Sequence, residues 1–459
     1  MFIKKCFSSV LAFCLVFLNV ICLASCSYGP KTPEALLIAM GTAMSDVDSY
    51  EVNSSLDMKT HVNSYEYTCK ADSKDIVIGL NSGEFYYYGK ASSTVESPAL
   101  GIKEDLEVIN SYDGGKYLIC TEGSGISQNI FSEMTDEEAR EYVKGNLTDT
   151  DVSGCDSIEM TKNEDETYTL VFSGFKKDVI DSFTESAGID ATLFENEVKD
   201  IKQTVIVDVS FFIKSVTFEL VFDTADSTKN IPKVIFKSEY SNYGKASKHP
   251  EAPDFSESQK VYDVRVLATL RDMLAEKKNS NEELVSFRLK ILHKAKYRGR
   301  VEESTEEYTV RYGVKDSGYF YDVQMSLAGN KYRIRYEDGK QTVTYKSNSK
   351  VEDQTETEAR AFIGGLISTV GYNASYISDI QKNEENVYKL ASQSLPAAVS
   401  ISLVQDGGSI DSSSNEMTFK LVDGQIKSIK EVRTLKLQRM VSGVLLPADY
   451  TMDITLTFN

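Results

Sequence analysis

The side chains best suited to acid–base or nucleophilic chemistry are scattered along this chain of 459 residues. The three histidines, His61, His249 and His293, stand far apart, whereas a general base or a metal ligand needs a suitable partner close by. Acidic runs such as Glu302–Glu307 could supply the paired carboxylates of glycoside cleavage, but that reaction needs one acid in a water-poor pocket. The chain also has no Trp to stack on a sugar ring. We therefore expect no catalytic residues, no enzyme activity, no metal ion and no cofactor.

The first 25 residues have the layout of an export signal. Lys4 and Lys5 precede an apolar run over residues 7–23, which is too short to span a bilayer comfortably but typical of a signal-peptide core. No other stretch of the sequence is apolar enough to cross a membrane. We predict that residues 1–25 are a signal peptide and are removed.

One cysteine has a chemical role that its neighbours predict. The apolar run ends in Leu23, Ala24 and Ser25 directly before Cys26, which resembles the bacterial lipobox. In a lipobox the signal peptidase recognises the aliphatic and small residues, and the cysteine thiol takes a diacylglycerol before cleavage. The resemblance implies a lipoprotein with acyl chains on Cys26 and a short tether over residues 26–31, held on the outer face of the bacterial cytoplasmic membrane. The alternative is an ordinary signal peptide or uncleaved anchor with a chance cysteine.

The mature chain is strongly acidic, and the excess of acid lies in its first half. The formal charge is −19, and loss of Lys4 and Lys5 with the signal peptide makes it −21. Residues 26–255 hold 20 Lys and Arg against 41 Asp and Glu, whereas residues 256–459 hold 28 of each. Nucleic acid and anionic lipid surfaces both require a basic footprint, so we exclude nucleic acid as a partner. A solvated extracellular surface explains the charge, and a docking site for a basic partner is the alternative.

Three cysteines remain in the mature chain besides Cys26. Cys69, Cys120 and Cys155 are separated by 51 and 35 residues, which matches no zinc motif. Their odd number defines no disulfide framework. We predict structural thiols, and one disulfide with a leftover thiol is the open alternative.

The chain contains an internal repeat. Thr135–Arg140 recurs as Thr355–Arg360, and Lys162–Glu164 recurs as Lys382–Glu384, both at an offset of 220 residues. Further pairs follow in the same order with small changes of offset: Ser317-Gly318 for Ser82-Gly83, Gly339-Lys340 for Gly115-Lys116, and Ile426–Ser428 for Ile213–Ser215. Because 434 residues are also too many for one core, we predict two copies of one domain, over residues 32–248 and 259–459. Residues 249–258, with Pro250 and Pro253, form the expected stiff linker.

Each copy is expected to begin with a helix and continue in strands. Thr32 and Pro33 are suited to the N-cap and first position of a helix. The apolar stripe at helical spacing comprises Leu36, Leu37, Met40, Met44 and Val47 in the first copy and Val261, Val264, Leu267, Leu270 and Leu274 in the second. Residues 285–291 then alternate with period two, as in a half-buried strand, and Asp338-Gly339 and Asp423-Gly424 are hairpin turn pairs. The pairs Thr135/Glu138 and Thr355/Glu358 have capping-box spacing and predict a helix within each copy.

These patterns predict an α+β fold class. Each repeat is expected to be a curved antiparallel sheet, or half-barrel, with helices covering its concave apolar face. The leading helix, the Tyr-rich meander and the domain end Tyr240–Lys245 followed by Pro250 resemble the half-barrel lipoproteins related to LolA and LppX, including two-domain lipoproteins of Gram-positive bacteria. The second copy ends without this tail. In that family the sheet and helices enclose an apolar cavity for acyl chains or lipoproteins, so the resemblance implies binding of a lipid or another hydrophobic ligand.

Candidate lining residues for such a cavity come from two helical stripes. They are Leu36, Leu37 and Met40 in the leading helix, and Ile180 and Phe183 in a second amphipathic segment over residues 179–198, whose counterpart near residues 399–404 is shorter. The same residues would serve equally as ordinary core, because a sequence pattern does not distinguish a filled core from an open cavity. Two functions therefore stand: a lipid-anchored carrier of a hydrophobic ligand, or a non-catalytic interaction or spacer protein of the cell envelope with filled cores.

Overall fold

The computed structural model divides into two compact units. Unit 1 comprises residues up to 127 and residues 133–257, and unit 2 comprises residues 128–132 and 258–459. The structure describes residues 30–459 except residues 63–64, 82, 101, 124, 147–153, 178, 181–182, 184–197, 224–229, 252–253, 316–317, 328, 373–375, 384, 393–408 and 442–443. The predicted signal peptide, its recognition residues Leu23, Ala24 and Ser25, and Cys26 all lie outside the described residues.

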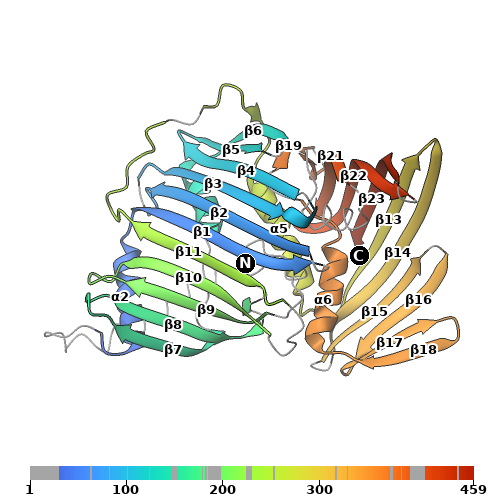
Figure 1. The fold of residues 1–459 in the computed structure, drawn as a ribbon, viewed down its shortest axis with the longest axis horizontal. Coiled ribbons are helices and arrows are strands. Elements are labelled where there is room, and N and C mark those ends of the chain that lie inside the picture. Colours follow the sequence, from blue (N-terminus) through green and yellow to red (C-terminus); the bar gives the residue numbers. More distant parts are fainter. Residues whose placement is uncertain are drawn as a thin grey trace. The chain divides into compact units, whose positions relative to one another are not determined.

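Among its described residues, the first part of the chain has two helices, a short 3-10 turn and eleven strands (Figure 1). They are α2 (Pro33–Ser45), β1 (Ser49–Val62), β2 (Tyr65–Ile78), β3 (Tyr86–Ser97), η1 (Pro98–Leu100), β4 (Ile102–Asp113), β5 (Lys116–Gly123), β6 (Ile126–Glu133), α3 (Asp136–Asn146), β7 (Cys155–Lys162), β8 (Tyr168–Phe175), β9 (Val198–Val207), β10 (Ile213–Phe222) and β11 (Lys233–Ser241).

The second part of the chain adds two helices and twelve strands among the described residues. They are β12 (Gln259–Lys260), α5 (Arg265–Lys278), β13 (Val285–Tyr297), β14 (Arg300–Lys315), β15 (Gly318–Leu327), β16 (Asn330–Glu337), β17 (Lys340–Tyr345), β18 (Asn348–Asp353), α6 (Glu356–Ile367), β19 (Ile377–Lys382), β20 (Val387–Ser392), β21 (Ser409–Val422), β22 (Gln425–Val441) and β23 (Val444–Phe458).

Two large sheets follow the same plan, in which the first long strand pairs with the last. The first sheet has the order β12-β6-β5-β4-β3-β2-β1-β11-β10-β9-β8-β7, and the second has the order β18-β17-β16-β15-β14-β13-β23-β22-β21-β20-β19. β1 pairs antiparallel with β2 and β11, and β13 pairs antiparallel with β14 and β23. The strand that follows the leading helix therefore lies in the middle of each sheet, with a run of hairpins on either side.

The prediction of an α+β half-barrel covered by helices is wrong. The chain is mostly strand, and its two large antiparallel sheets are accompanied by only four helices among the described residues. The longest helix, α5, has 14 residues and is therefore about 21 Å long and roughly 10 Å wide. Eleven strands at about 4.8 Å spacing extend for roughly 50 Å, so two such helices do not cover a sheet of this size. The sequence pattern located helices correctly but did not indicate how many strands each sheet contains.

The predicted helix starts at Thr32 and Thr355 are confirmed, whereas the predicted helical stripe of the second copy begins before its helix. Thr32 is the N-cap of α2, where its hydroxyl accepts a hydrogen bond from the backbone N–H of Ala35, and Pro33 is the first helical residue. Thr355 and Glu358 form a complete capping box at the start of α6. In the second copy the helix α5 begins at Arg265, after Val261 and Val264 of the predicted stripe. None of the described helices is both long and apolar enough to cross a bilayer.

The predicted strand and hairpins of the second copy are also confirmed. In β13 the side chains of Val285, Phe287, Leu289 and Ile291 are buried, and those between them are more exposed. Asp338-Gly339 and Asp423-Gly424 join β16 to β17 and β21 to β22, and all four residues have positive φ angles. Positive φ at both central residues gives a two-residue turn whose twist matches that of the flanking strands.

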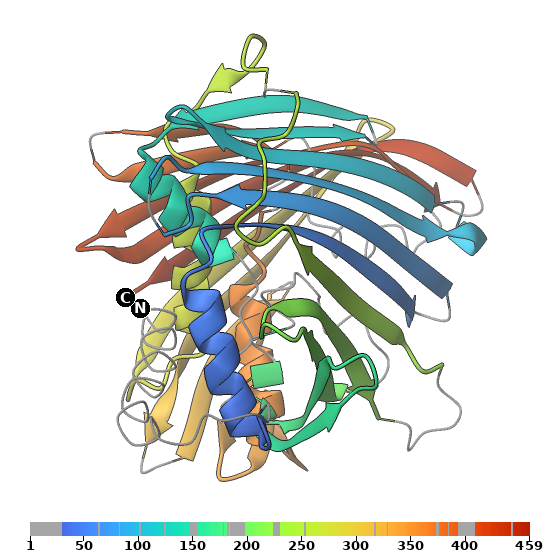
Figure 2. The same cartoon turned by 90° about the vertical axis from the view of Figure 1, so that its left-hand side faces the viewer.

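A hydrophobic core cluster of unit 1 lies on one face of strands β8–β11, which we call its core face. α2, dark blue in Figure 2, lies along this part of the sheet, where Leu36 and Met40 join Phe172, Phe218 and other buried side chains in one cluster. The opposite face carries side chains such as Asn53, which pairs with Glu239 across β1 and β11, and we call it the polar face. An antiparallel sheet with one packed and one solvated face gives this alternation.

Leu36 tests the energetic importance of the α2 contact. Its side chain is 0% exposed, so Leu36→Ala should lower the free energy of unfolding of unit 1 by about 2–5 kcal/mol through lost burial and a residual cavity. Urea unfolding followed by circular dichroism measures this change. Thr42→Ala, at an exposed position of the same helix, is the control and should stay within about 0.5 kcal/mol of the unmodified chain. Equal unfolding midpoints for Leu36→Ala and the unmodified chain would contradict this packing.

Candidate functional site

The five candidate cavity residues lie together in the core cluster of unit 1. Leu36, Met40, Ile180 and Phe183 are buried members of this cluster, and Leu37 packs against it. Phe183 lies 4.8 Å from Phe218 between ring centroids. None of the five lines either of the two pockets described below. The sequence therefore grouped these side chains correctly, and the structure surrounds them with other core side chains.

Most of the second amphipathic segment lies outside the described residues. Within residues 179–198 only residues 179, 180, 183 and 198 are described, and Val198 is already the first residue of strand β9. Its counterpart near residues 399–404 lies entirely outside the described residues. An amphipathic helix over residues 179–198 therefore stays a prediction.

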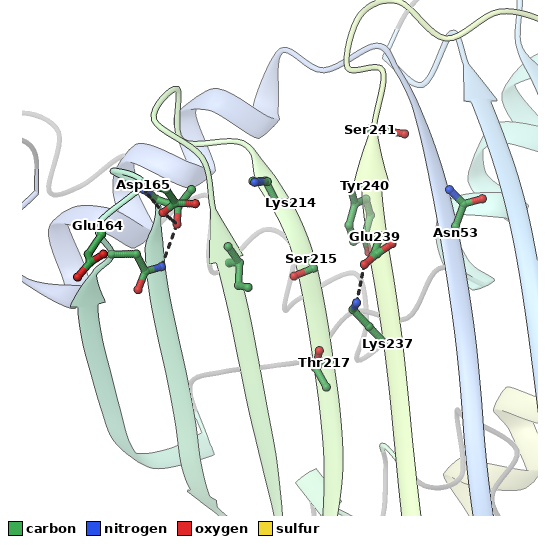
Figure 3. A pocket seen from close by; sticks show the side chains of 13 residues that line it. Asn53, Glu164, Asp165, Lys214, Ser215, Thr217, Lys237, Glu239, Tyr240 and Ser241 are labelled. Carbon is green, nitrogen blue, oxygen red and sulfur yellow. Dashed lines mark hydrogen bonds and ion pairs between the residues drawn. The ribbon is translucent and has the colours of Figure 1, made fainter.

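The larger pocket, which we call the polar pocket, is an open hollow of about 800 Å³ in unit 1. Figure 3 shows that its side chains come from the turn between β7 and β8 and from the neighbouring strands β9, β10, β11 and β1. Its lining residues are Asn53, Asn163, Glu164, Asp165, Thr167, Ile206, Lys214, Ser215, Thr217, Lys237, Glu239, Tyr240 and Ser241. Amides, hydroxyls, three carboxylates and two ammonium groups predominate.

Hydrogen bonds already organise both ends of the polar pocket. The Lys237 ammonium donates to the Glu239 carboxylate at 2.5 Å, and both side chains are about half exposed. At the other end the Thr167 hydroxyl donates to Asp165 at 2.6 Å (Figure 3). This bond, with a second from the Thr167 backbone N–H and the nearby Lys214 charge, lowers the pKa of Asp165. The pocket is thus a hydrated surface that can form many hydrogen bonds with a polar partner.

The second pocket lies in unit 2 and is also polar. It has a volume of about 560 Å³ and opens over strands β13, β14 and β15. Its lining residues are Lys290, Leu292, Glu303, Ser304, Thr305, Glu307, Ser326 and Gly329. The Lys290 ammonium is 2.8 Å from the Glu307 carboxylate. As in unit 1, exposed ion pairs of this kind contribute little stability and leave their atoms accessible to a partner.

An aspartate that the sequence reasoning missed lies on the same face of unit 1 as the buried Val52. Asp75 pairs with Val52 on one side and Gly89 on the other, and it accepts a 2.7 Å hydrogen bond from the Tyr87 hydroxyl. A Cβ atom at Gly89 would lie 2.4 Å from both Asp75 Oδ1 and Tyr87 Oη, so a larger residue there would have to displace this hydrogen-bonded pair. Burial raises the pKa of Asp75. The sequence could have indicated this position, because Asp75 lies an even number of residues from Tyr67 and Val77 in β2, and alternate residues of a strand share one face. Both of those side chains are buried.

The segment predicted to be a linker makes specific contacts within unit 1. Directly before it, the Lys248 ammonium is 3.0 Å from Glu84 and 2.9 Å from Asp113. The His249 ring stacks on Tyr88 with 4.1 Å between centroids, and its backbone N–H donates to the Tyr86 hydroxyl. The start of the predicted spacer is therefore fixed to the sheet over β3.

The described thiols and histidines lie in separate environments and do not form a nucleophile–base pair. Cys69 and Cys120 are free thiols, and burial raises the pKa of both, which makes the reactive thiolate less available. His61, His249 and His293 each contact different groups. Within the described part of the chain, no group of three or more His, Cys, Asp or Glu side chains is placed to hold a metal ion.

Comparisons with known proteins assign no family. No family model and no curated protein matches the chain. Among solved structures, an AttH protein from Nitrosomonas europaea is 7% identical over 90% of this chain and 93% of its own, with a TM-score of 0.14. Pseudomonas aeruginosa OccK10 (7% identical, 90% and 99% covered, TM-score 0.13) and OprD (6%, 90% and 95%, TM-score 0.14) are similar to the same extent. At these scores the likeness supports no conclusion on fold or function.

The raised pKa of Asp75 predicts a pH dependence of stability. Asp75 has a higher pKa in the folded state than in the unfolded chain, where its pKa is near 3.8. The protonated side chain therefore stabilises the folded state fully below about pH 3.8, and this stabilisation is lost as the pH rises through the folded-state pKa. Asp75→Asn does not ionise and should therefore flatten the decline in unfolding free energy above about pH 4. Urea unfolding at a series of pH values measures this. Asp72→Asn, exposed on the same strand, should keep the profile of the unmodified chain, and an unchanged Asp75→Asn profile would contradict the prediction.

Proposed function

We propose that this chain is a lipid-anchored extracytoplasmic protein that acts by non-catalytic interaction in the bacterial cell envelope. In this proposal diacylglycerol on Cys26 holds the protein at the outer face of the cytoplasmic membrane. The two sheet units present hydrated polar faces to a partner and also act as a spacer. The observation that carries the proposal is the closed packing of the residues that a ligand cavity would need.

The core of unit 1 favours this function over carriage of a hydrophobic ligand. Leu36 is 0% exposed and Ile180 is 2% exposed, and both belong to a cluster of seventeen buried side chains. A carrier needs apolar side chains that face a void, since side chains that fill one another's space leave no room for an acyl chain. Both described pockets are instead open and polar.

The polar pocket supplies the accessible groups that an interaction protein needs. Its carboxylates, ammonium groups, amides and hydroxyls lie on neighbouring strands of a rigid sheet (Figure 3). Such groups form hydrogen bonds with a polar partner without requiring a buried apolar surface.

The resemblance to half-barrel lipoproteins supports the competing function, in which a lipid or another hydrophobic ligand is carried. Native mass spectrometry of soluble protein that begins at Ser27, purified from a bacterial host, separates the two. We expect the mass of the chain alone, before and after incubation with envelope lipids, because the core is filled. Solvent extraction of the same sample should release no lipid.

Co-purifying lipid at about one molecule per chain or per unit would overturn the proposed interaction function with filled cores. It would also identify the class of ligand that is carried. Leu36→Phe provides a control on that outcome. A larger side chain at a lipid-lining position should reduce lipid occupancy, whereas lipid bound to the outer surface would be unaffected. A lipid signal that is equal in both proteins would therefore locate the lipid outside the core of unit 1.

The anchor is tested by removing the modified thiol. Cys26→Ser should abolish incorporation of labelled palmitate and prevent cleavage before residue 26, because the thiol is the group that receives the diacylglycerol. The readouts are fluorography and the mass of the N-terminal peptide. Cys14→Ser, within the apolar run, is the matched control and should keep both lipid and cleavage. Labelled lipid on the Cys26→Ser protein would rule out this anchor.

A further inference from the structure

We call the face of the second sheet that carries the buried Leu289 and Ile291 its core face. This face also carries a group of side chains that could bind a metal ion. His293 on β13 has the same parity as the buried Leu289 and Ile291, and it lies directly opposite Met452 on β23. Glu306 lies opposite Ile291 on β14, one diagonal step from His293. Directly opposed residues have Cβ atoms about 4.5–5.5 Å apart and diagonal neighbours about 7–8 Å, so the Met452 thioether and the Glu306 carboxylate approach the His293 imidazole from either side.

The two ring nitrogens of His293 have different surroundings. Nδ1 lies 2.5 Å from the Tyr450 hydroxyl, which fixes the orientation of the ring. Nε2 is buried and has no hydrogen-bond partner, although the Oε1 atom of Glu306 is 3.3 Å away. The distance is suitable for a hydrogen bond, but the alignment is not. Two ligand atoms on a tetrahedral metal at about 2.0–2.1 Å are separated by roughly 3.3 Å, which this pair matches.

The carboxylate of Glu306 is held in place as well. Its Oε2 atom accepts a 2.7 Å hydrogen bond from the Tyr308 hydroxyl, which leaves Oε1 directed at His293. Tyr450 therefore positions the imidazole and Tyr308 positions the carboxylate. Metal-binding imidazoles and carboxylates usually have such supporting hydrogen bonds, which hold the ligand atoms in place before the metal arrives.

The neighbouring positive charge is neutralised. Met452 also lies opposite Arg433 on β22, which is 3% exposed. The Arg433 side chain donates to the Glu431 carboxylate at 2.5 Å and to the Thr369 carbonyl at 2.6 Å. This buried arginine is therefore occupied by its own partners, and its charge does not exclude a cation from the His293 side of Met452.

We propose that His293 Nε2, Glu306 Oε1 and the Met452 thioether form a copper-binding site in unit 2. Imidazole nitrogen binds copper in both of its common oxidation states, and a thioether is a soft ligand that favours Cu(I). Among divalent first-row ions, Cu²⁺ also binds a given set of nitrogen and oxygen ligands most tightly. Magnesium and calcium prefer all-oxygen sites and fit this ligand set poorly.

Copper titration of the mature chain from Ser27 tests the site, with Cys69, Cys120 and Cys155 replaced by serine so that no thiol competes. Electron paramagnetic resonance of the Cu(II) form should reveal one copper bound through an imidazole nitrogen. His293→Gln should remove one equivalent of bound copper and that nitrogen coupling. Met452→Leu should keep the Cu(II) signal but weaken Cu(I) binding by at least tenfold in competition with a chromophoric chelator.

His61→Gln is the matched control, because His61 also lies near a glutamate, with Nε2 3.7 Å from Glu66. It should leave copper binding unchanged. Copper that binds equally to the unmodified and His293→Gln proteins would overturn the proposal, and so would loss of the signal in His61→Gln. If His293→Gln does not fold, as judged by circular dichroism, Glu306→Gln replaces it and should lower Cu(II) affinity. Unchanged affinity in that variant overturns the site.

Discussion

The pairing of the first long strand with the last is the interaction on which each unit depends. β1 pairs with β11 from Glu51 opposite Ser241 to Lys59 opposite Lys233, and β13 pairs with β23 from Phe287 opposite Phe458 to Lys296 opposite Asp449. Most other neighbouring strands are joined by short hairpins, so they form locally. In each copy this ladder joins residues about 150–190 positions apart, and such closure is entropically costly and slow. It also determines which side chains from the two ends of a copy share a face.

The consequence for chemistry is that every multi-residue site in these sheets depends on register. Asn53 reaches the polar pocket because β1 pairs with β11, and Met452 faces His293 because β23 pairs with β13. A slip by one residue in either ladder would exchange the core and polar faces of a whole strand. The buried alternation of Phe287, Leu289 and Ile291 opposes such a slip. Packing on the core face thus determines where the polar groups lie.

Features set by neighbours in the sequence were predictable, and features set by the long ladders were not. The capping box at Thr355, the start of α2 at Thr32 and the turn at Asp338-Gly339 each need only a few adjacent residues. The fold class failed because period-two patterns do not reveal how many strands join one sheet. The contact of His293 with Tyr450 spans 157 positions, so no local spacing predicted it. The candidate core residues were found because helical spacing is itself local.

The two copies differ at two equivalent buried positions of one strand. The recurrence of Ile213–Ser215 as Ile426–Ser428 aligns Phe218 with Glu431 and Leu220 with Arg433. In unit 1 both side chains belong to the apolar core. In unit 2 they form a buried ion pair, and the Glu431 carboxylate also accepts a hydrogen bond from the Asn415 amide. Such a pair seldom stabilises a fold more than hydrophobic residues of similar size, so stability alone does not explain it. The copy with this polar interior is also the one for which we propose a metal site at His293, whereas the first copy has apolar side chains at the equivalent positions.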